Sequence, residues 1–181
     1  LDLMVQNLMT ITQIEKGDIN MCFESFDLIE LGKEVIDQLE KNAYQKQVQL
    51  KLLNSKDEPI YAIGDYQRIY QVIQNLMANS INHAGSGAQA TIRITPIGKK
   101  VVFELFDNGI GIPKSDLPRI FERFYRVDKS RSKGTGGSGL GLSIVKHIIE
   151  SHQSKINVES SRKGIKFWFD LKGSNAVSYT H

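Results

Sequence analysis

The segments DNGIG (residues 107–111) and GTGGSGLGL (residues 134–142) decide how the rest of the chain is interpreted. The alternating apolar run VVFELF (residues 101–106) precedes the first segment and predicts a strand. The second segment leads into apolar residues at helical spacing, namely Leu142, Val145, Ile148 and Ile149. Glycines let backbone amides approach a ligand closely, and a helix start favours anions. The two segments together predict a site for a phosphate-bearing ligand.

Neither glycine segment matches another common phosphate-binding loop. GSGLG (residues 137–141) lacks the compact strand–turn–helix unit of a dinucleotide site. No Lys-Ser or Lys-Thr follows either segment as a G-x-x-x-x-G-K-[ST] loop requires. Either segment alone could be a simple turn, and their occurrence together favours a ligand site.

The composition is that of a soluble globular protein. The 181 residues are 40% hydrophobic and 24% charged, which suits one domain, or one domain with an appendage. The net charge of +3 is too small to indicate nucleic acid binding, and we expect none. The single cysteine, Cys22, excludes a disulfide framework and a cysteine metal site. No segment has the length and apolarity of a membrane span, and no signal peptide opens the chain.

The chain begins with apolar residues at helical spacing from Leu1, without a cap, and this pattern stops at Gly17. A single amphipathic helix of this length is not stable unless its apolar stripe packs on something. We therefore expect this chain to be a piece of a longer protein, with its first helix belonging to a bundle whose other members lie elsewhere.

Hydrophobic periodicity predicts an α+β fold. We expect a two-layer α/β sandwich, with helices covering one face of a mixed sheet, and an N-terminal helical extension. The expected helices cover residues 1–16, 27–46, 65–83 and 140–151, with short helix and loop at 113–124. The expected strands cover residues 19–26, 48–53, 60–63, 91–95, 101–106, 155–160 and 165–171. Three parts are predicted: the extension at 1–17, a domain at 18–172 and a disordered tail at 173–181.

The helix predicted at residues 65–83 carries a stripe of polar side chains beside its apolar face. Asn75, Asn79 and either Asn82 or His83 recur at intervals of three to four, so they lie along one side. Asparagine is a mediocre helix former, and several in one helix suggest a reason beyond helix formation. The stripe is either a solvated face or a ligand site, where an amide oxygen joins a Mg²⁺ shell that also takes phosphate oxygens.

Four motifs, taken in order, resemble those of the ATP-binding domain of bacterial sensor histidine kinases. That domain has the Bergerat-type ATP-binding fold shared with the gyrase B subunit, Hsp90 and MutL. The motifs are QNLMANSINHA (74–84), similar to the N box, DNGIG, similar to the G1 box, IFERFYRVD (120–128), similar to the F box, and GTGGSGLGLSIVKHIIESH (134–152), similar to the G2 box. The resemblance covers about residues 1–171. Within it, residues 1–17 resemble the end of the second helix of the dimerisation and phosphoacceptor hairpin.

The resemblance implies ATP and Mg²⁺ as cofactors. Asp107 would accept a hydrogen bond from the adenine amino group, and Asn79 would coordinate Mg²⁺ while Asn75 supports the phosphate side. The implied catalytic residues are Asn75, Asn79 and Arg126. The implied nucleotide-binding residues are Asn75, Asn79, Asn82, His83, Asp107, Gly109, Gly111, Ile112, Tyr125, Arg126, Gly137, Ser138, Gly139, Leu140, Gly141 and Leu142. Residues 114–138 would form a lid that closes on the nucleotide, with Phe121 and Phe124 as its anchors.

Some positions depart from the family pattern. Asn82 stands where the family often has a lysine facing the phosphates, and His83 stands where it often has tyrosine. The phosphate charge would then be met by other basic residues, namely Arg126, Lys129 or Arg131. The last helix ends in His152-Gln153-Ser154, where the family usually turns with glycines.

Asn75 occupies the position where the hydrolysing relatives carry a glutamate base. An amide cannot take a proton from water or serine, so this pattern favours phosphoryl transfer to an imidazole. We predict a protein-histidine kinase domain that donates the γ-phosphoryl group of Mg-ATP to a histidine, for relay to a response regulator aspartate. No histidine here has the sequence context of a phosphoacceptor, so the acceptor is expected upstream on the hairpin. The alternative is a degenerate nucleotide-binding or docking module without kinase turnover.

The resemblance also implies partners and a location. The partners would be ATP, the phosphoacceptor hairpin of the same protein and the receiver domain of a response regulator. The full-length protein would be a homodimer, and this chain alone a monomer or weak dimer. The domain would be cytoplasmic, in a parent protein that is an inner-membrane or plasma-membrane sensor.

Overall fold

One mixed sheet of seven strands organises the computed structural model, which describes residues 2–54, 58–127 and 139–174. The strands are β1 (Glu24–Asp27), β2 (Gln49–Leu52), β3 (Tyr61–Gly64), β4 (Gln89–Ile97), β5 (Lys100–Asp107), β6 (Asn157–Ser161) and β7 (Gly164–Gly173). Their order is β1-β3-β7-β5-β4-β2. Strand β6 stands outside this order and pairs with the first half of β7, whereas β3 pairs with the end of β7. Among these described strands the β2–β4 pair is parallel and the other pairs are antiparallel.

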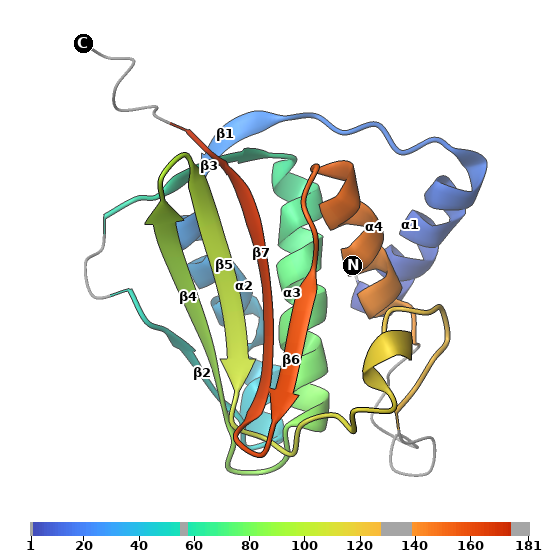
Figure 1. Ribbon diagram of the computed structural model, residues 1–181, viewed down its shortest axis with the longest axis vertical. Helices are drawn as coiled ribbons and strands as arrows, with labels where there is room; N and C mark the ends of the chain where they lie inside the picture. The colour runs from blue at the N-terminus through green and yellow to red at the C-terminus, as the bar shows by residue number, and fades with distance from the viewer. Residues whose placement is uncertain (1, 55–57, 128–138, 175–181) are drawn as a thin grey trace.

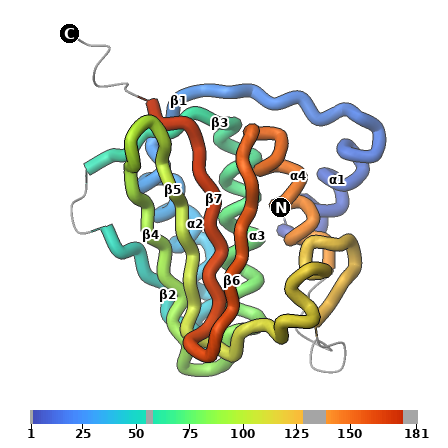
Figure 2. The backbone as a smooth tube through the Cα atoms, viewed as in Figure 1, coloured from blue at the N-terminus to red at the C-terminus, as the bar shows by residue number. Residues whose placement is uncertain are grey.

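The helices lie on one face of this sheet, as the sequence predicted (Figure 1). They are α1 (Leu3–Lys16), α2 (Leu28–Gln45), α3 (Tyr66–His83) and α4 (Gly141–Ser151), with a short 3₁₀ turn, η1 (Leu117–Arg119). The central helix α3 packs between α2 and α4, and α1 lies beside α4 at the side away from the sheet (Figure 2). The predicted two-layer sandwich with an N-terminal helical extension is therefore confirmed.

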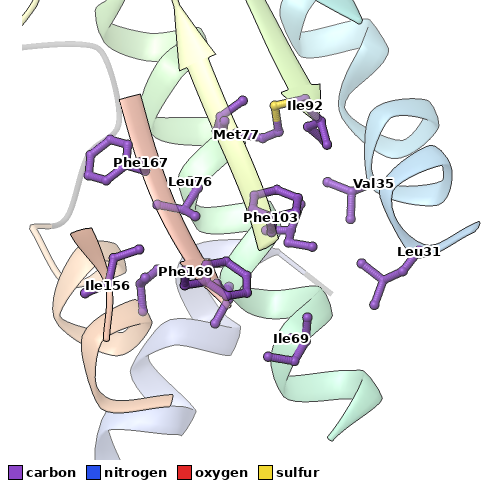
Figure 3. Packing of buried hydrophobic residues seen from close by; sticks show 14 of the residues in the cluster. Leu31, Val35, Ile69, Leu76, Met77, Ile92, Phe103, Ile156, Phe167 and Phe169 are labelled. Carbon is purple, nitrogen blue, oxygen red and sulfur yellow. The ribbon is translucent and has the colours of Figure 1, made fainter. Parts of the chain in front are cut away.

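The core fills the space between α3 and the middle of the sheet (Figure 3). Leu76 and Met77 of α3 face Phe103 of β5 and Phe167 of β7, and all four side chains are fully buried. The rings of Phe103 and Phe169 stack with centroids 5.0 Å apart. Burial of apolar surface on this scale is the main stabilising contribution to such a fold, and it fixes α3 and β5 rigidly against each other.

Local signals in the sequence place the starts of α2 and α3 and the end of α1 correctly. The start of α1 was predicted wrongly, because Asp2 caps this helix by accepting from the Met4 amide. The Asp27 carboxylate accepts from the Ile29 amide and the Asp65 carboxylate from the Arg68 amide, so both residues are N-caps. Gly17 ends α1 in the left-handed conformation with φ +70°. The turn after α4 forms without glycine, because Gln153 itself adopts a φ of 59°.

Several strands differ in their bounds from those predicted, most clearly β1 and β4. The strand expected at residues 19–26 is present only as β1, because residues 24–27 alone pair with β3. The strand expected at residues 91–95 extends to Gln89–Ile97, because β4 pairs with β5 from Ala90 to Ile97. Pairing with a neighbouring strand decides strand length, and local periodicity does not reveal it.

Helix α1 does not pack through the apolar stripe that its sequence suggests. Ile11 contacts the main core, but Met4, Val5 and Leu8 are exposed. The buried residues of α1 are instead the polar Asn7 and Thr10. Membership of α1 in a helical bundle therefore stays a prediction.

The ends of the chain leave two further predictions open. Gly173 and Ser174 still donate backbone hydrogen bonds, to Lys99 at 2.8 Å and to Tyr61 at 3.0 Å, so β7 runs further than expected. The rest of the predicted disordered tail, residues 175–181, lies outside the described residues. The division at residues 17 and 18 stays a prediction. In the described ranges no helix combines the length and apolarity needed to cross a membrane.

Candidate functional site

Asp107 is the last residue of β5, and its carboxylate reaches Ser80 of α3. Strand β5 and helix α3 end at the same side of the molecule (Figure 1). Asp107 is only 5% exposed. One oxygen, Oδ2, accepts from the Ser80 hydroxyl at 3.0 Å, and Oδ1 accepts from the Gly109 amide at 3.0 Å. Burial raises the pKa of Asp107, and the hydrogen bonds from Gly109 and Ser80 oppose that rise. The site thus holds a carboxylate in one orientation, with lone pairs left for a ligand.

Ser80 was missed at the sequence level as a site residue. Helical periodicity assigned it to the apolar face of α3, and it is indeed 1% exposed. Its hydroxyl reaches Asp107 because α3 and β5 pack directly against each other, 27 residues apart in sequence. A serine interrupting an apolar face is the signal that could have found it, since a buried hydroxyl needs a partner.

The turn after Asp107 is fixed by close contacts with protein on both sides. A Cβ on Gly109 would lie 2.4 Å from the backbone of Ala84, the C-cap of α3, so no larger residue fits. The Ile112 amide donates to the Ser160 hydroxyl of β6 at 2.7 Å. Gly109 therefore lies against the end of α3, whereas Gly111 and Ile112 lie against β6. The contact of these three predicted binding residues with nucleotide stays a prediction.

The polar stripe of α3 divides into two chemically different parts. Asn75 is 4% exposed, and its amide exchanges two hydrogen bonds with Asn7 of α1. Asn79 and Asn82 are half-buried, and no side-chain hydrogen bond involves either amide among the residues that the structure describes. An amide in that state is suited to a metal shell completed by phosphate oxygens and water. In the described ranges no group of three or more His, Cys, Asp or Glu side chains could hold a metal, so Asn79 remains the predicted ligand.

Positive charge gathers at the end of α3. Protein atoms packed around His83 lower the pKa of its imidazole, and the charges of Arg126 and Lys46 lower it further, although the residue keeps exposed surface. Arg126 and Lys46 therefore lie close enough to His83 for their charges to interact. Lys46, the C-cap of α2, was not predicted. Lys129 and Arg131 lie outside the described residues.

Phe124, inside the predicted lid of residues 114–138, meets Gly139, the first residue after that lid. The Phe124 amide donates to the Gly139 carbonyl at 2.8 Å, and both residues have left-handed backbones, with φ of 65° and 75°. A Cβ on Gly139 would lie 2.6 Å from Phe124, so this position requires glycine. Leu140 is buried, and Gly141 and Leu142 begin α4. The predicted binding residues Gly137 and Ser138 lie outside the described residues.

Tyr125 is held by residues from the first part of the predicted lid. Its hydroxyl donates to the Asp116 carboxylate, and the Arg119 guanidinium lies 4.5 Å from the centre of its ring. The hydrogen bond with Asp116 raises the pKa of Tyr125. Contact between Tyr125 and phosphate stays a prediction, and it requires the Asp116 bond to be exchanged.

A sequence model of the family described as histidine kinase-, DNA gyrase B- and HSP90-like ATPase matches residues 64–175. That range contains α3, Asp107, both glycine segments and the last strand of the sheet. This chain belongs to that family. Drug sensory protein A of Synechocystis sp. is 36% identical over 179 residues, which are 93% of this chain and 26% of that protein. Sensor histidine kinase WalK of Bacillus subtilis is 30% identical over 171 residues, 93% of this chain and 28% of that protein.

Solved structures agree with the sequence relatives. The catalytic domain of histidine kinase ThkA superposes with a TM-score of 0.71 at 30% identity, covering 84% of this chain and 96% of that one. ThkA in complex with the response regulator protein TrrA gives a TM-score of 0.73 at 26% identity, covering 94% of this chain and 48% of that one. The chain is an ATP-binding domain of the bacterial sensor histidine kinase type. The chain spans about a quarter of the length of each of the two curated relatives named above.

Proposed function

We propose that this histidine kinase domain binds ATP with Mg²⁺ and donates the γ-phosphoryl group to a histidine on a helical hairpin outside the described chain. The observation that carries the proposal is Asp107, a buried carboxylate at the end of β5 whose oxygens are oriented by Ser80 and Gly109. A carboxylate accepts from the amino group of adenine. It repels the carbonyl oxygen that guanine presents at the same place, so Asp107 selects ATP over GTP.

The phosphates would lie along α3, beyond Asp107. Asn79 supplies an amide oxygen that protein side chains leave unused in the described structure, and Arg126 and Lys46 supply positive charge near His83. Mg²⁺, when bound, neutralises phosphate charge and orients the γ-phosphoryl group. Lys46 would thus provide part of the charge that Asn82 lacks.

Transfer to an imidazole fits the absence of a base on α3. The helix carries no Asp or Glu between Tyr66 and His83, and Asn75 stands where a glutamate base would be needed to activate water. A neutral imidazole nitrogen needs no such activation. It forms a bond to the γ-phosphorus as the bond to the bridging oxygen breaks and ADP leaves. The residues of this chain position the phosphoryl group and stabilise its charge.

The partners of the domain follow from its relatives. ThkA is known in complex with the response regulator protein TrrA, and this supports a response regulator aspartate as the final acceptor for the present protein. The phosphoacceptor hairpin, the homodimer formed through it, and a membrane-bound parent protein complete the proposal. The competing function is that of a docking module, which keeps the fold but does not use ATP. Asn82 favours this alternative, because it is neutral where the family often has a lysine that faces the phosphates.

Calorimetric titration of the chain with ATP, with and without Mg²⁺, tests the proposal. We expect saturable, magnesium-dependent binding that Asp107→Asn weakens strongly, because the amide keeps only one acceptor oxygen and the Gly109 amide already donates to one. GTP should bind far more weakly. Asp37→Asn, an exposed aspartate of α2, is the matched control and should bind as the unsubstituted chain does. Absence of ATP binding to folded protein would instead support the docking module.

A further inference from the structure

A buried polar network joins α1 to the asparagine stripe of α3. The Asn7 amide donates to the Asn75 oxygen at 2.8 Å and accepts from the Asn75 amide at 3.1 Å. Gln71 donates to the Asn7 oxygen at 3.1 Å and to the Thr10 hydroxyl at 2.9 Å. These four residues are between 3% and 6% exposed. Asn7 and Asn75 are 68 residues apart in sequence, so the pairing is a tertiary contact made by α1.

Contacts of α1 also extend to the predicted lid and to the start of α4. A Cβ on Gly141, the first residue of α4, would lie 3.0 Å from the Asn75 oxygen, so Asn75 is wedged between α1 and the start of α4. Glu15 of α1 forms an ion pair of 2.7 Å with Arg123, which lies within the predicted lid of residues 114–138. A displacement of α1 therefore changes contacts at Arg123 and, through Asn75, at the start of α4.

The attachment of α1 is suited to reversal. Its buried residues are polar, whereas Met4, Val5, Leu8 and Met9 are between 42% and 54% exposed. A polar interface contributes little net free energy, because each of its hydrogen bonds replaces one made with water. Buried polar contacts instead favour one arrangement over others. Helix α1 is thus placed specifically but held weakly.

Asn75 has two roles that compete for access to its amide. It is the predicted support of the phosphate side, yet its side-chain oxygen and nitrogen are both engaged by Asn7. Each atom of the Asn75 amide keeps one further donor or acceptor beyond its bond with Asn7. The residue is nevertheless 4% exposed, so the docked helix leaves a ligand almost no access to that amide.

We propose that α1 regulates the nucleotide site by competing for Asn75: docked α1 occupies its amide through Asn7, and bound Mg-ATP recruits that amide and releases α1. This inference rests on the proposed function, because it concerns the same site. Coupling of this kind is reciprocal, so a docked α1 weakens nucleotide binding by the factor by which nucleotide weakens docking. Asn7 is then a positioning residue that acts on the nucleotide through Asn75.

The first test measures the ATP affinity of Asn7→Ala, Asn75→Ala and the double variant by calorimetry in the presence of Mg²⁺. We expect Asn7→Ala to bind ATP about fivefold more tightly than the unsubstituted chain. Asn75→Ala should bind more weakly, and the double variant should behave as Asn75→Ala does, because the gain requires a free Asn75. A purely structural role for Asn7 predicts lower stability without tighter binding.

The controls separate failure of this inference from failure of the proposed function. Thr12→Ala, an exposed position on α1, should leave affinity unchanged. Unchanged or weaker binding by folded Asn7→Ala, or a gain that survives in the double variant, overturns the inference while ATP binding itself stands. No binding of ATP by the unsubstituted chain overturns both.

Hydrogen exchange on the unsubstituted chain tests the coupling from the other side and needs no variant to fold. Mg-ATP should accelerate amide exchange in Leu3–Lys16 while slowing it at the ends of α3 and β5. Slower or unchanged exchange in α1, accompanied by protection of α3 and β5, contradicts the competition.

Discussion

Asn75 and Asn79 lie four residues apart on the same side of α3, yet the protein treats their side chains in opposite ways. The amide of Asn75 is buried and exchanges hydrogen bonds with Asn7, whereas the half-buried Asn79 makes no side-chain hydrogen bond within the described ranges. A buried polar group without a partner is costly, but a polar group at a ligand site must be left without one. The contrast teaches that residue type and helical position do not assign a role. The partners of each side chain do.

The largest expected effect is on catalysis, at Asn79. Asn79→Ala should lower phosphoryl transfer to a supplied hairpin by about 100-fold or more, because it removes a group that acts on the phosphates. The free energy of unfolding should change by less than about 0.5 kcal/mol, since no protein partner is lost. Radiolabel transfer and chemical denaturation measure the two effects. A large loss of stability in Asn79→Ala would contradict this assignment, because it would show that the Asn79 side chain, like that of Asn75, has a partner in the folded protein.

A large loss of stability, beside weaker nucleotide binding, is expected at Asn75. Asn75→Ala should lower the free energy of unfolding by about 2 kcal/mol, because Asn7 loses both its hydrogen bonds to Asn75 in a buried place. Urea denaturation at one pH measures this loss. An unchanged midpoint would show that the network of α1 does not persist in solution.

Ser80→Ala should have an intermediate effect, confined to nucleotide binding. Its hydroxyl orients Asp107, and hydrogen bonds to a charged group are stronger than those between neutral groups. We expect ATP affinity to fall by about tenfold. Calorimetry with Ser151→Ala, a serine of α4 that bonds only to its own helix, provides the matched control. Equal affinity of the two variants would show that Gly109 alone suffices to orient Asp107.

The smallest effect is expected on the pH dependence of stability, at His152. The Asp65 amide donates to its Nε2 at 3.0 Å, so Nδ1 carries the proton and bonds to the Ile148 carbonyl at 2.8 Å. Burial lowers the pKa of His152, which means that the folded protein favours the neutral ring. This stability is fully present above the pKa of the unfolded chain, about 6.5, and is lost as the pH falls from there toward the lower folded pKa.

Denaturation curves between pH 8 and about 5 measure this dependence in the chain and in His152→Gln. The variant should lose part of the decline on acidification, and His83, whose pKa is also lowered, should account for a remaining part of the same sign. His147→Gln, on the same helix, should retain the full decline. An identical slope in His152→Gln would contradict the assigned role.

The sequence predicted the features that depend on residues close together in the chain, such as helix caps. Asp27 and Asp65 are recognisable as caps because a short acceptor precedes an apolar helical pattern, and Gly17 marks a helix end for the same kind of reason. The order of the motifs predicted the site around Asp107 and the asparagine stripe. Strand lengths were less predictable, because β1 and β4 extend as far as their neighbours pair with them.

The sequence did not reveal contacts between distant segments. The hydrogen bonds of Ser80 with Asp107 and of Asn7 with Asn75 could not be predicted, because each depends on how two elements pack. The bonded residues are 27 and 68 positions apart in sequence, respectively. Helix α1 was expected to pack through apolar residues, and periodicity could not show that Asn7 and Thr10 are its buried residues. The roles of Tyr125 and Arg126 toward a nucleotide stay predictions.

The hydrogen bond between Phe124 and Gly139 has a consequence for engineering. It joins two positions that flank residues 125–138 in the sequence. The entropy of closing a loop grows slowly with length, by about 0.6 kcal/mol for each doubling. A segment inserted between these two anchors is therefore expected to leave the sandwich intact, and the domain offers a natural graft point for a peptide that reports on ligand occupancy.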